Sequence, residues 1–476
     1  MIEIHKLRWS DRDLNTRIPF KYGIATMVDV THVWLELEAT IDGERVLGQS
    51  ADHLPPKWFT KDPNRPLEDE VEEMRDVLDF AGATAVGVRR ETVHAVMQHV
   101  AQAQEEWAKG EGLPTLLSHF GVTFVERALI DAFCRRHDAP VGAVLRSNGL
   151  GVVLSDLHPE LADWEPKQGL PEATLGRVAS RHTVGLGDPL EEADVIEEER
   201  PADDLPVSLR AVCRHYQSHD FKIKVAGDPD AALDRLERVV RLIDEETSTE
   251  FSASIDGNES FANMEDFRDF WTKARARPGL ADFWSRLMFV EQPIHRDHAL
   301  AEDIAESLQE WPEQPPLLID ESGGSESDLR QALKLGYIGV SHKNCKGVIQ
   351  GVANRCLLTK RMRENPELAL QMSAEDLSNI GPIALPQDLA VQAALGNASV
   401  ERNGHHYFAG LSEWPESIWP QVATKYPDLY RTDVTGCPFV HVDSGQIDLT
   451  QVNARAFGGE LLDMKTAGQL WLVQGD

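Results

Sequence analysis

Five short apolar runs in the middle of the chain end in acidic or basic residues. The acids are Asp256, Glu291 and Asp320, and lysines precede and follow them at Lys224 and Lys343. The successive steps are 256−224 = 32, 291−256 = 35, 320−291 = 29 and 343−320 = 23 residues. A (β/α)₈ barrel uses about 31 residues for each strand–helix unit and gathers its active-site residues at the carboxyl ends of its strands. The spacing therefore predicts five successive barrel strands that bring three carboxylates and flanking lysines to one rim.

Three carboxylates at one rim would favour a bound cation. Like charges that converge either take up protons or need a counter-ion. Ligands that are all oxygen favour Mg²⁺ or a similar hard ion, and no cluster of cysteines or histidines accompanies them to suggest zinc. A single acid at a strand end more often caps the next helix, but capping does not require acids on three consecutive units. We therefore expect Asp256, Glu291 and Asp320 to bind Mg²⁺.

The lysines of the first run alternate along a predicted strand. Lys222 and Lys224 lie on one face of that strand, so both would point to the rim. Two ammonium groups and a metal ion disfavour one another's charge, which lowers the pKa of a lysine toward the range of a base. The structural alternatives are an ion-paired surface strand for this pair and a surface lysine for Lys343. Lys346 is expected to be peripheral or to pack along the following helix.

Taken together, these residues resemble the enolase superfamily, of the mandelate racemase and muconate lactonizing enzyme type. The K-x-K of that family's second barrel strand matches Lys222 and Lys224, and its metal-binding acids match the three acids named above. In the muconate lactonizing subgroup a lysine ends the sixth strand, as Lys343 would here. The resemblance implies that Lys224 is a base, that Lys222 is its electrostatic helper and that Lys343 stands on the opposite face of the substrate.

The resemblance also implies a fold. It is an α/β architecture, a modified TIM (β/α) barrel with an N-terminal α+β capping domain that the C-terminal segment completes. We expect the capping domain at 1–150, the barrel at 151–410 and the C-terminal segment at 411–476, packed back on both. Residues 19–23 resemble the start of the family's mobile substrate-covering loop, and residues 445–460 resemble its closing segment.

Candidates for substrate contacts are less specific. Near the eighth strand the family's dipeptide epimerases carry a D-x-D, where this chain has Glu401 and Asn403, which argues against dipeptide specificity. Asp376 and Ser378 could line the pocket or cap a helix, and no His–Asp dyad of the racemase kind is recognisable. The substrate-binding candidates are Tyr22, Asn258, Glu321, Glu375 and His405.

The rest of the pattern fits this organisation. Alternating apolar residues before an Asp42-Gly43 turn predict an N-terminal β-hairpin. Residues 68–137 have a helical pattern, and from 207 to about 410 short strands alternate with helices. The irregular stretch 150–206 is expected to hold the first barrel strand near residues 182–188, together with an insertion.

Composition excludes several classes of function. The 476 residues suggest two domains, and the formal net charge of −32 opposes binding to nucleic acid. No run approaches the ~20 apolar residues that span a bilayer, and the charged N-terminus lacks the pattern of a signal peptide. Five scattered cysteines without a CxxC pair indicate reduced thiols. We expect a cytoplasmic protein, and the resemblance implies a homo-oligomer.

The function expected from these residues is Mg²⁺-dependent removal of the proton α to a carboxylate, through an enediolate. Two bases on opposite faces would give racemisation or epimerisation, whereas one base and a β leaving group would give cycloisomerisation or dehydration. The expected partner is a small carboxylic acid, which the sequence does not identify, and the enzyme would be an isomerase or a lyase. Two alternatives are a catalytically inactive enolase-fold protein for binding or assembly, and a metal-dependent aldolase or sugar isomerase, whose pattern lacks the K-x-K.

Overall fold

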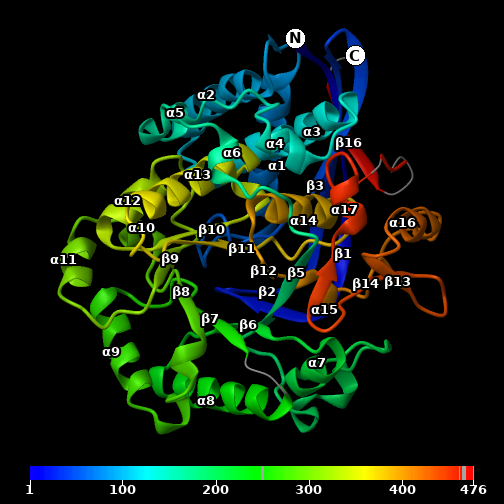
Figure 1. The fold of residues 1–476 in the computed structure, drawn as a ribbon. Helices are drawn as coiled ribbons and strands as arrows, with labels where there is room; N and C mark the ends of the chain where they lie inside the picture. Colours follow the sequence, from blue (N-terminus) through cyan, green and yellow to red (C-terminus); the bar gives the residue numbers. More distant parts are fainter. Residues whose placement is uncertain (248–250, 460, 464–467, 475–476) are drawn as a thin grey trace.

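The computed structural model describes residues 1–247, 251–459, 461–463 and 468–474, and it places a sheet-and-helix cap over one end of a barrel (Figure 1). The cap sheet is an antiparallel meander of β1 (Ile2–Tyr22), β2 (Ala25–Ile41) and β3 (Glu44–Leu54). The predicted hairpin turn is confirmed, because Asp42 and Gly43 have φ of 50° and 83° between β2 and β3. The strand β16 (Gln469–Gln474) pairs antiparallel with β1, so the C-terminal segment adds to the cap as expected.

Helices cover one face of the cap sheet. They are α1 (Leu67–Ala85), α2 (Val93–Glu111) and α3 (Thr115–Arg136), close to the predicted helical range, and the short β4 (Arg89–Arg90) pairs with β1. Helix α3 is buried along almost its whole length. It approaches β3 closely at Gly48, where an added Cβ would lie 2.0 Å from the carbonyl oxygen of Ala128. The absence of a side chain at Gly48 is therefore what lets α3 lie against the sheet.

The barrel contains eight parallel strands within the described ranges. They follow the order β11-β10-β9-β8-β7-β6-β5-β12, and the two end strands contact each other. Inside the barrel, Arg181 of β5 donates hydrogen bonds to Ser373 Oγ of β11 (2.8 Å) and to the carbonyl oxygen of Ala374 (3.1 Å). The strands are β5 (Arg177–Val184), β6 (Asp220–Lys224), β7 (Ser252–Asp256), β8 (Leu287–Glu291), β9 (Leu317–Ile319), β10 (Gly339–His342), β11 (Gln371–Ala374) and β12 (Ser399–Glu401).

The first barrel strand begins earlier than the sequence suggested. It is β5, which ends at Val184 and overlaps the predicted range 182–188 only in part. The strand β15 (Gln446–Asp448) pairs antiparallel with β5, so the expected closing segment does return to the barrel. Glu460, the last residue of that predicted segment, lies outside the described residues.

Helices follow most of the barrel strands. The main ones are α7 (Leu209–Tyr216), α8 (Pro229–Glu246), α9 (Met264–Arg275), α12 (Asp328–Leu335), α13 (Val348–Glu364) and α14 (Ala384–Leu395). Shorter helices are α4 (Val141–Arg146), α5 (Leu154–Leu157), α6 (Pro166–Gly169), α10 (Arg296–Ala299), α11 (Asp303–Gln309), α15 (Gly404–Tyr407), α16 (Trp419–Lys425) and α17 (Thr450–Ala454). Two further strands, β13 (Tyr430–Thr432) and β14 (Pro438–Val440), form a hairpin. Single 3₁₀ turns cover Pro159–Leu161, Glu192–Asp194, Glu197–Glu199, Pro278–Leu280, Phe283–Arg286 and Asn344–Lys346.

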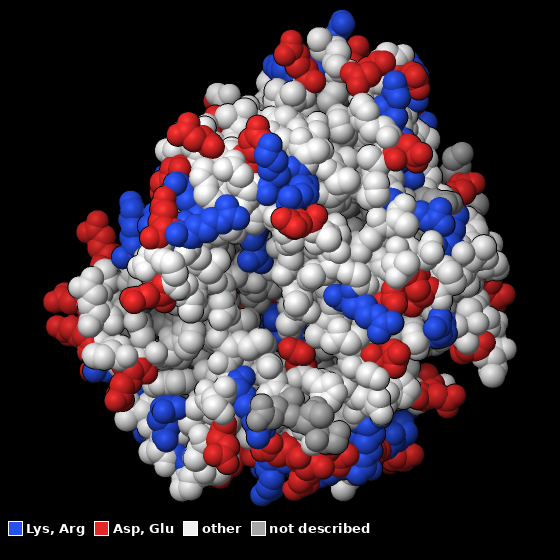
Figure 2. All heavy atoms as spheres, viewed as in Figure 1, with Lys and Arg blue, Asp and Glu red and all other residues white. Residues whose placement is uncertain are grey.

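Within the stretch 150–206, Glu191 and Asp194 lie beside α7 and α8, where acidic and basic side chains alternate along the lower edge of Figure 2. Arg210 lies 2.6 Å from Glu191 and 2.8 Å from Glu245, and its guanidinium also contacts Glu246. Part of the acidic surface is therefore neutralised locally. The five cysteines are free and buried. None of the helices in the described ranges combines the length and the apolar character of a membrane span.

Replacing Gly48 with alanine should destabilise the cap. The added methyl group would collide with the backbone of α3, and overpacking of this kind costs about 1–3 kcal/mol. Gly110 of α2 is the matched control, because an added Cβ there meets no heavy atom within 4 Å. We expect calorimetry to give a lower melting temperature for Gly48→Ala and an equal or higher one for Gly110→Ala. Equal melting of Gly48→Ala and the wild type would show that α3 moves away at no cost.

Candidate active site

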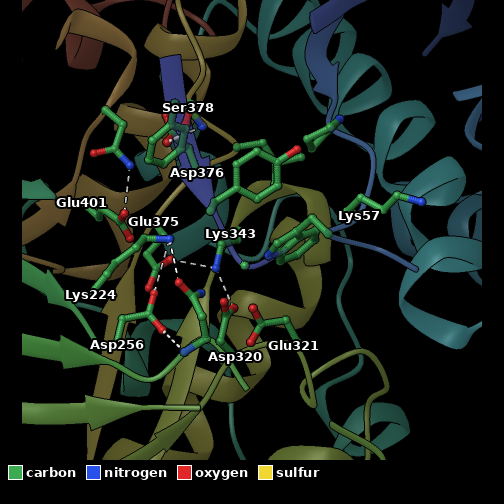
Figure 3. Close-up of a pocket in the computed structure, with 18 of the residues that line it drawn as sticks. Lys57, Lys224, Asp256, Asp320, Glu321, Lys343, Glu375, Asp376, Ser378 and Glu401 are labelled. Carbon is green, nitrogen blue, oxygen red and sulfur yellow. Dashed lines mark hydrogen bonds and ion pairs between the residues drawn. The ribbon is translucent and has the colours of Figure 1, made fainter. Parts of the chain in front are cut away.

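A pocket lies between the cap and the carboxyl ends of the barrel strands (Figure 3). The cap contributes residues of the β1–β2 hairpin and of the segment 55–61. The barrel contributes residues at or just after the ends of β6, β7, β9, β10, β11 and β12. The predicted site residues on this wall are Tyr22, Lys222, Lys224, Asp256, Asn258, Asp320, Glu321, Lys343 and Glu375.

Lys222 is the central cation of the site. Its Nζ lies 3.1 Å from Asp256, 2.8 Å from Glu291, 3.0 Å from Glu375 and 2.7 Å from Glu401. Burial disfavours the ammonium, but these carboxylates outweigh it and raise the pKa of Lys222 well above its usual value. Lys222 therefore acts here as a fixed positive charge.

Lys343 and Lys346 share one carboxylate. The Nζ atoms of both lie 2.6 Å from Asp320 Oδ1, and Lys346 also donates to the carbonyl oxygens of Asp320 (2.7 Å) and Ser341 (2.9 Å). The expectation that Lys346 is peripheral is wrong, because the 3₁₀ turn after β10 points it back at the strand ends. Burial opposes the charge of Lys343, but Asp320 and Glu375 raise its pKa well above the usual value. The lowered pKa predicted for the Lys222–Lys224 pair is not found at Lys222, because four carboxylates surround its ammonium.

Lys224 is held less tightly than the other lysines. Its Nζ donates to Asn258 Oδ1 at 2.8 Å and lies 3.8 Å from Asp256. The ring centroid of Phe20, from the cap, lies 5.5 Å from the same nitrogen. We call the acidic residues at the barrel strand ends, with Lys222, the floor of the pocket. The amino group of Lys224 thus lies between this floor and the cap.

Three carboxylates converge closely enough to share a cation. One oxygen from each of Glu291, Asp320 and Glu375 lies within 4.8 Å of the others. Neither oxygen of Glu291 accepts a hydrogen bond within the described ranges, and burial, with Glu375 beside it, raises the pKa of Glu291 well above its usual value. Glu291 keeps the ion pair with Lys222, at 2.8 Å, and a buried carboxylate of this kind in an all-oxygen donor set fits a hard divalent ion. The predicted ligand Asp256 lies outside this close group, next to Lys222.

Glu375 and Glu401 organise the lysines. Glu375 was predicted as a substrate contact, yet its Oε2 lies 3.0 Å from Lys222 and 2.8 Å from Lys343, and its Oε1 accepts from Ser341 Oγ at 2.7 Å. Glu401 binds Lys222 and accepts from Thr183 Oγ1 (2.5 Å) and Asn403 Nδ2 (2.9 Å). The sequence singled out Glu401 only as a departure from a D-x-D, and its position on the last barrel strand was the available signal.

The remaining substrate candidates divide. Asn258 contacts Lys224, and Tyr22 lines the pocket while its hydroxyl donates to the carbonyl oxygen of Pro56 at 2.7 Å. His405 and Glu291 are not among the residues that line this pocket. The chain turns into α15 after β12, which packs the ring of His405 edge-on against Tyr216 with centroids 4.8 Å apart.

The cap fixes the loop that carries Lys343 and Lys346. Glu126 of α3 accepts from the backbone amides of Val348 (2.6 Å) and Ile349 (3.3 Å), the first residues of α13. Such amides lack partners within the helix, so a carboxylate there caps it. Thr123 of α3 also donates to the carbonyl oxygen of Cys345 at 3.2 Å. The loop between β10 and α13 is therefore held by cap residues.

A second contact ties the cap to the loops after β7 and β8. Glu259 accepts from Nε and from an Nη atom of Arg296 at 2.8 Å each, and Lys61 Nζ lies 3.2 Å from Glu259. Arg296 also donates to the backbone carbonyl oxygens of Trp58 (2.9 Å) and Phe59 (3.0 Å). We call Glu259, Arg296 and Lys61 the clamp. It fixes the position of the 58–61 segment above the pocket.

Comparison with solved structures places this arrangement among known folds. An N-succinyl Arg/Lys racemase from Bacillus cereus aligns with TM-score 0.61 and 15% identity over 97% of this chain and 96% of its own. A 2-chloromuconate cycloisomerase from Rhodococcus opacus aligns with TM-score 0.61 and 16% identity over 98% of this chain and 100% of its own. A dipeptide epimerase from Enterococcus faecalis, complexed with Mg and L-Leu-L-Tyr, aligns with TM-score 0.61 and 12% identity over 96% of this chain and 100% of its own. No protein-family model and no curated protein matches the chain.

The chain therefore has the enolase-superfamily fold of the mandelate racemase and muconate lactonizing enzyme type. The similar structures are racemases, epimerases and cycloisomerases of low sequence identity to this chain. Its cap, barrel order and strand-end residues agree with the fold expected from the sequence.

The pH dependence of stability should reveal the buried Glu321 carboxyl. Burial, with Asp320 beside it, raises the pKa of Glu321 from 4.5 to about 8. The folded state thus binds a proton that the unfolded chain releases, so this group's stabilisation is full below pH 4.5 and is lost as the pH rises through about 8. Glu321→Gln should gain melting temperature over the wild type as the pH rises from 5 to 9. The exposed Glu364→Gln is the control, and a flat difference for both variants would contradict the assignment.

Proposed function

We propose that this protein is an Mg²⁺-dependent enzyme that removes the proton α to the carboxylate of a small acid. The observation that carries the proposal is the placement of Lys224 and Lys343 on one pocket wall, around a cluster of buried carboxylates. The names of the similar structures, a racemase, an epimerase complexed with Mg and a cycloisomerase, support the same class of reaction. The proposal includes membership of the enolase superfamily and extends to a cytoplasmic homo-oligomer.

Asp256, Glu291 and Asp320 are the ligands that we propose for the ion. Glu375 belongs to the close acid group, but both its oxygens already accept short contacts from Ser341, Lys222 and Lys343. Glu291 Oε2 lies 2.8 Å from Lys222, whereas Glu291 Oε1 has no hydrogen-bond partner within the described ranges. Glu375 is better suited to hold the lysines than to bind the ion. Bound there, Mg²⁺ would act as a Lewis acid that stabilises charge on the substrate carboxylate.

The three lysines Lys222, Lys224 and Lys343 have different proposed roles. Lys222 supplies fixed positive charge at the floor, where the substrate carboxylate would bind. Lys224 removes the α-proton on one face, because its Nζ is the lysine nitrogen with the fewest anionic partners at the cap boundary. Lys343 stands toward the other face. Binding of the ion by Asp320 would weaken the ion pair that raises the pKa of Lys343, so that Lys343 returns or removes a proton there. Two opposed amines favour racemisation or epimerisation, and a substrate with a β leaving group would undergo elimination or cycloisomerisation through one of them.

Magnesium should bind and stabilise the folded protein. At a concentration 100 times its Kd the ion should add about 2.7 kcal/mol to the free energy of unfolding. Isothermal titration calorimetry should show at least tenfold weaker Mg²⁺ binding for Asp256→Asn, Glu291→Gln and Asp320→Asn. A smaller loss is expected for Glu375→Gln, and none for the surface variant Glu364→Gln.

If Glu375→Gln weakened Mg²⁺ binding more than Asp256→Asn did, the third ligand would be Glu375 and not Asp256. If Mg²⁺ neither binds nor raises the melting temperature of the wild type, the protein is better described as an inactive binding or assembly protein of this fold.

Lys224→Ala should abolish exchange of the substrate α-proton with deuterated solvent. General-base catalysis contributes about 10²–10⁴-fold, so the loss should be at least a hundredfold. Proton NMR of a set of chiral 2-substituted carboxylic acids in D₂O with Mg²⁺ measures this exchange. Lys343→Ala should remove exchange of the opposite enantiomer, while Lys360→Ala on the outer face of α13 should keep both. Unchanged exchange in Lys224→Ala would remove this lysine from the role of base.

A further inference from the structure

We propose that the acid taken by this site carries an apolar, ring-sized group on its α carbon and no second charged group. This inference rests on the proposed function, because it uses the carboxylate end and the two lysines to orient the substrate. It concerns the part of the pocket wall that the chemistry of the floor does not use.

Most of the side chains on the cap side of the pocket are apolar. Phe20, Tyr22 and Met27 of the β1–β2 hairpin line it, together with Trp58 and, from the barrel, Leu377. The Tyr22 hydroxyl is occupied by the carbonyl oxygen of Pro56, so its ring is what remains to contact a ligand. Phe20 packs against Tyr22 with ring centroids 5.5 Å apart. An apolar group gains from leaving water for such a wall, at about 25 cal/mol per Å².

Two of these rings stand over the two proposed bases. The Phe20 centroid lies 5.5 Å from Lys224 Nζ, and the Trp58 centroid lies 5.1 Å from Lys343 Nζ. An α carbon held between the two amines, with its carboxylate on the acidic floor, must direct its remaining large substituent toward the cap. That substituent would then enter the space between Phe20 and Trp58, where ring edges and faces pack favourably.

The cations on the cap side are already engaged within the described ranges. Lys57 Nζ lies 2.6 Å from Glu70 and 2.7 Å from the carbonyl oxygen of Asp62, and Figure 3 shows its amino group directed away from Lys343. Lys61 and Arg296 belong to the clamp and contact Glu259. A second substrate carboxylate near the cap would have to break one of these buried pairs, and such pairs are costly to break.

The carboxylates near the β12 side are engaged too. Glu401 binds Lys222 at 2.7 Å and Thr183 at 2.5 Å. Asp376 contacts Arg402 and accepts the backbone amide of Ser378 at 3.0 Å. Glu321 lines the pocket beside Asp320, and its Oε2 has no hydrogen-bond partner within the described ranges (Figure 3). It lies next to the acids where the substrate carboxylate would bind, so a substrate ammonium near the β12 side, such as the N-terminus of a dipeptide, meets only the engaged Glu401 and Asp376.

Binding of three acids to the wild-type protein with Mg²⁺ tests the inference. The probes are 2-phenylpropanoate, 2-methylsuccinate and L-alanyl-L-alanine, measured by isothermal titration calorimetry. We expect 2-phenylpropanoate to bind at least tenfold more tightly than the other two. Equal or tighter binding of the dicarboxylate or the dipeptide would overturn the inference, as would a failure of 2-phenylpropanoate to bind.

Two tryptophan variants test whether the ring-sized group binds at Trp58. Trp58→Ala should weaken the binding of 2-phenylpropanoate at least tenfold and change the affinity for 2-methylsuccinate less than threefold. Trp164 is the control, because Lys360 lies over its ring at 5.6 Å as Lys343 lies over Trp58, yet Trp164 is outside the pocket wall. Trp164→Ala should change neither affinity. Equal effects of the two variants would overturn the placement of the ring-sized group.

Exchange of the α-proton separates this inference from the reaction itself. If Lys224-dependent exchange occurs with a dicarboxylic acid but 2-phenylpropanoate does not bind, the inference fails and the proposed function stands. If 2-phenylpropanoate binds preferentially but no acid exchanges its α-proton, the apolar subsite stands and the proposed reaction fails.

Discussion

The structure depends on neutralising a set of carboxylates that the barrel brings together out of water. Asp256, Glu291, Glu375 and Glu401 all surround the single ammonium of Lys222, and Asp320 is held by two further lysines. Buried charges are tolerated only when they are paired. The strand ends can converge because lysines and acids interleave, and the close group of Glu291, Asp320 and Glu375 is where we propose that one more positive charge binds.

The site belongs to both parts of the fold. The acids and lysines come from the barrel, but Glu126 and Thr123 of α3 hold the loop that carries Lys343 and Lys346. The clamp connects the opposite side of the pocket to the 58–61 segment. Helix α3 can lie on the cap sheet only because Gly48 has no side chain. Since α3 also holds the loop that carries Lys343, the packing at Gly48 helps to set the position of this proposed base.

Sequence reasoning found the residues that repeat at strand spacing and missed those that depend on closure of the barrel. Lys222, Lys224, Asp256, Glu291, Asp320 and Lys343 each end an apolar run, so their convergence follows from period and topology alone. The bridging roles of Glu375 and Glu401 require β11 and β12 to meet at the ends of the strand order. Lys346 reaches Asp320 through a turn that ends at Gly347, with φ 99°, and His405 leaves the pocket because α15 begins at Gly404. No local pattern reports either bend.

Arg296 holds the cap segment by main-chain carbonyl oxygens rather than by side chains. Attachment of the 58–59 backbone therefore does not depend on which residues occupy those positions. The surface presented to a ligand can diversify in evolution while its anchorage, and the proposed proton-transfer groups below it, stay unaltered.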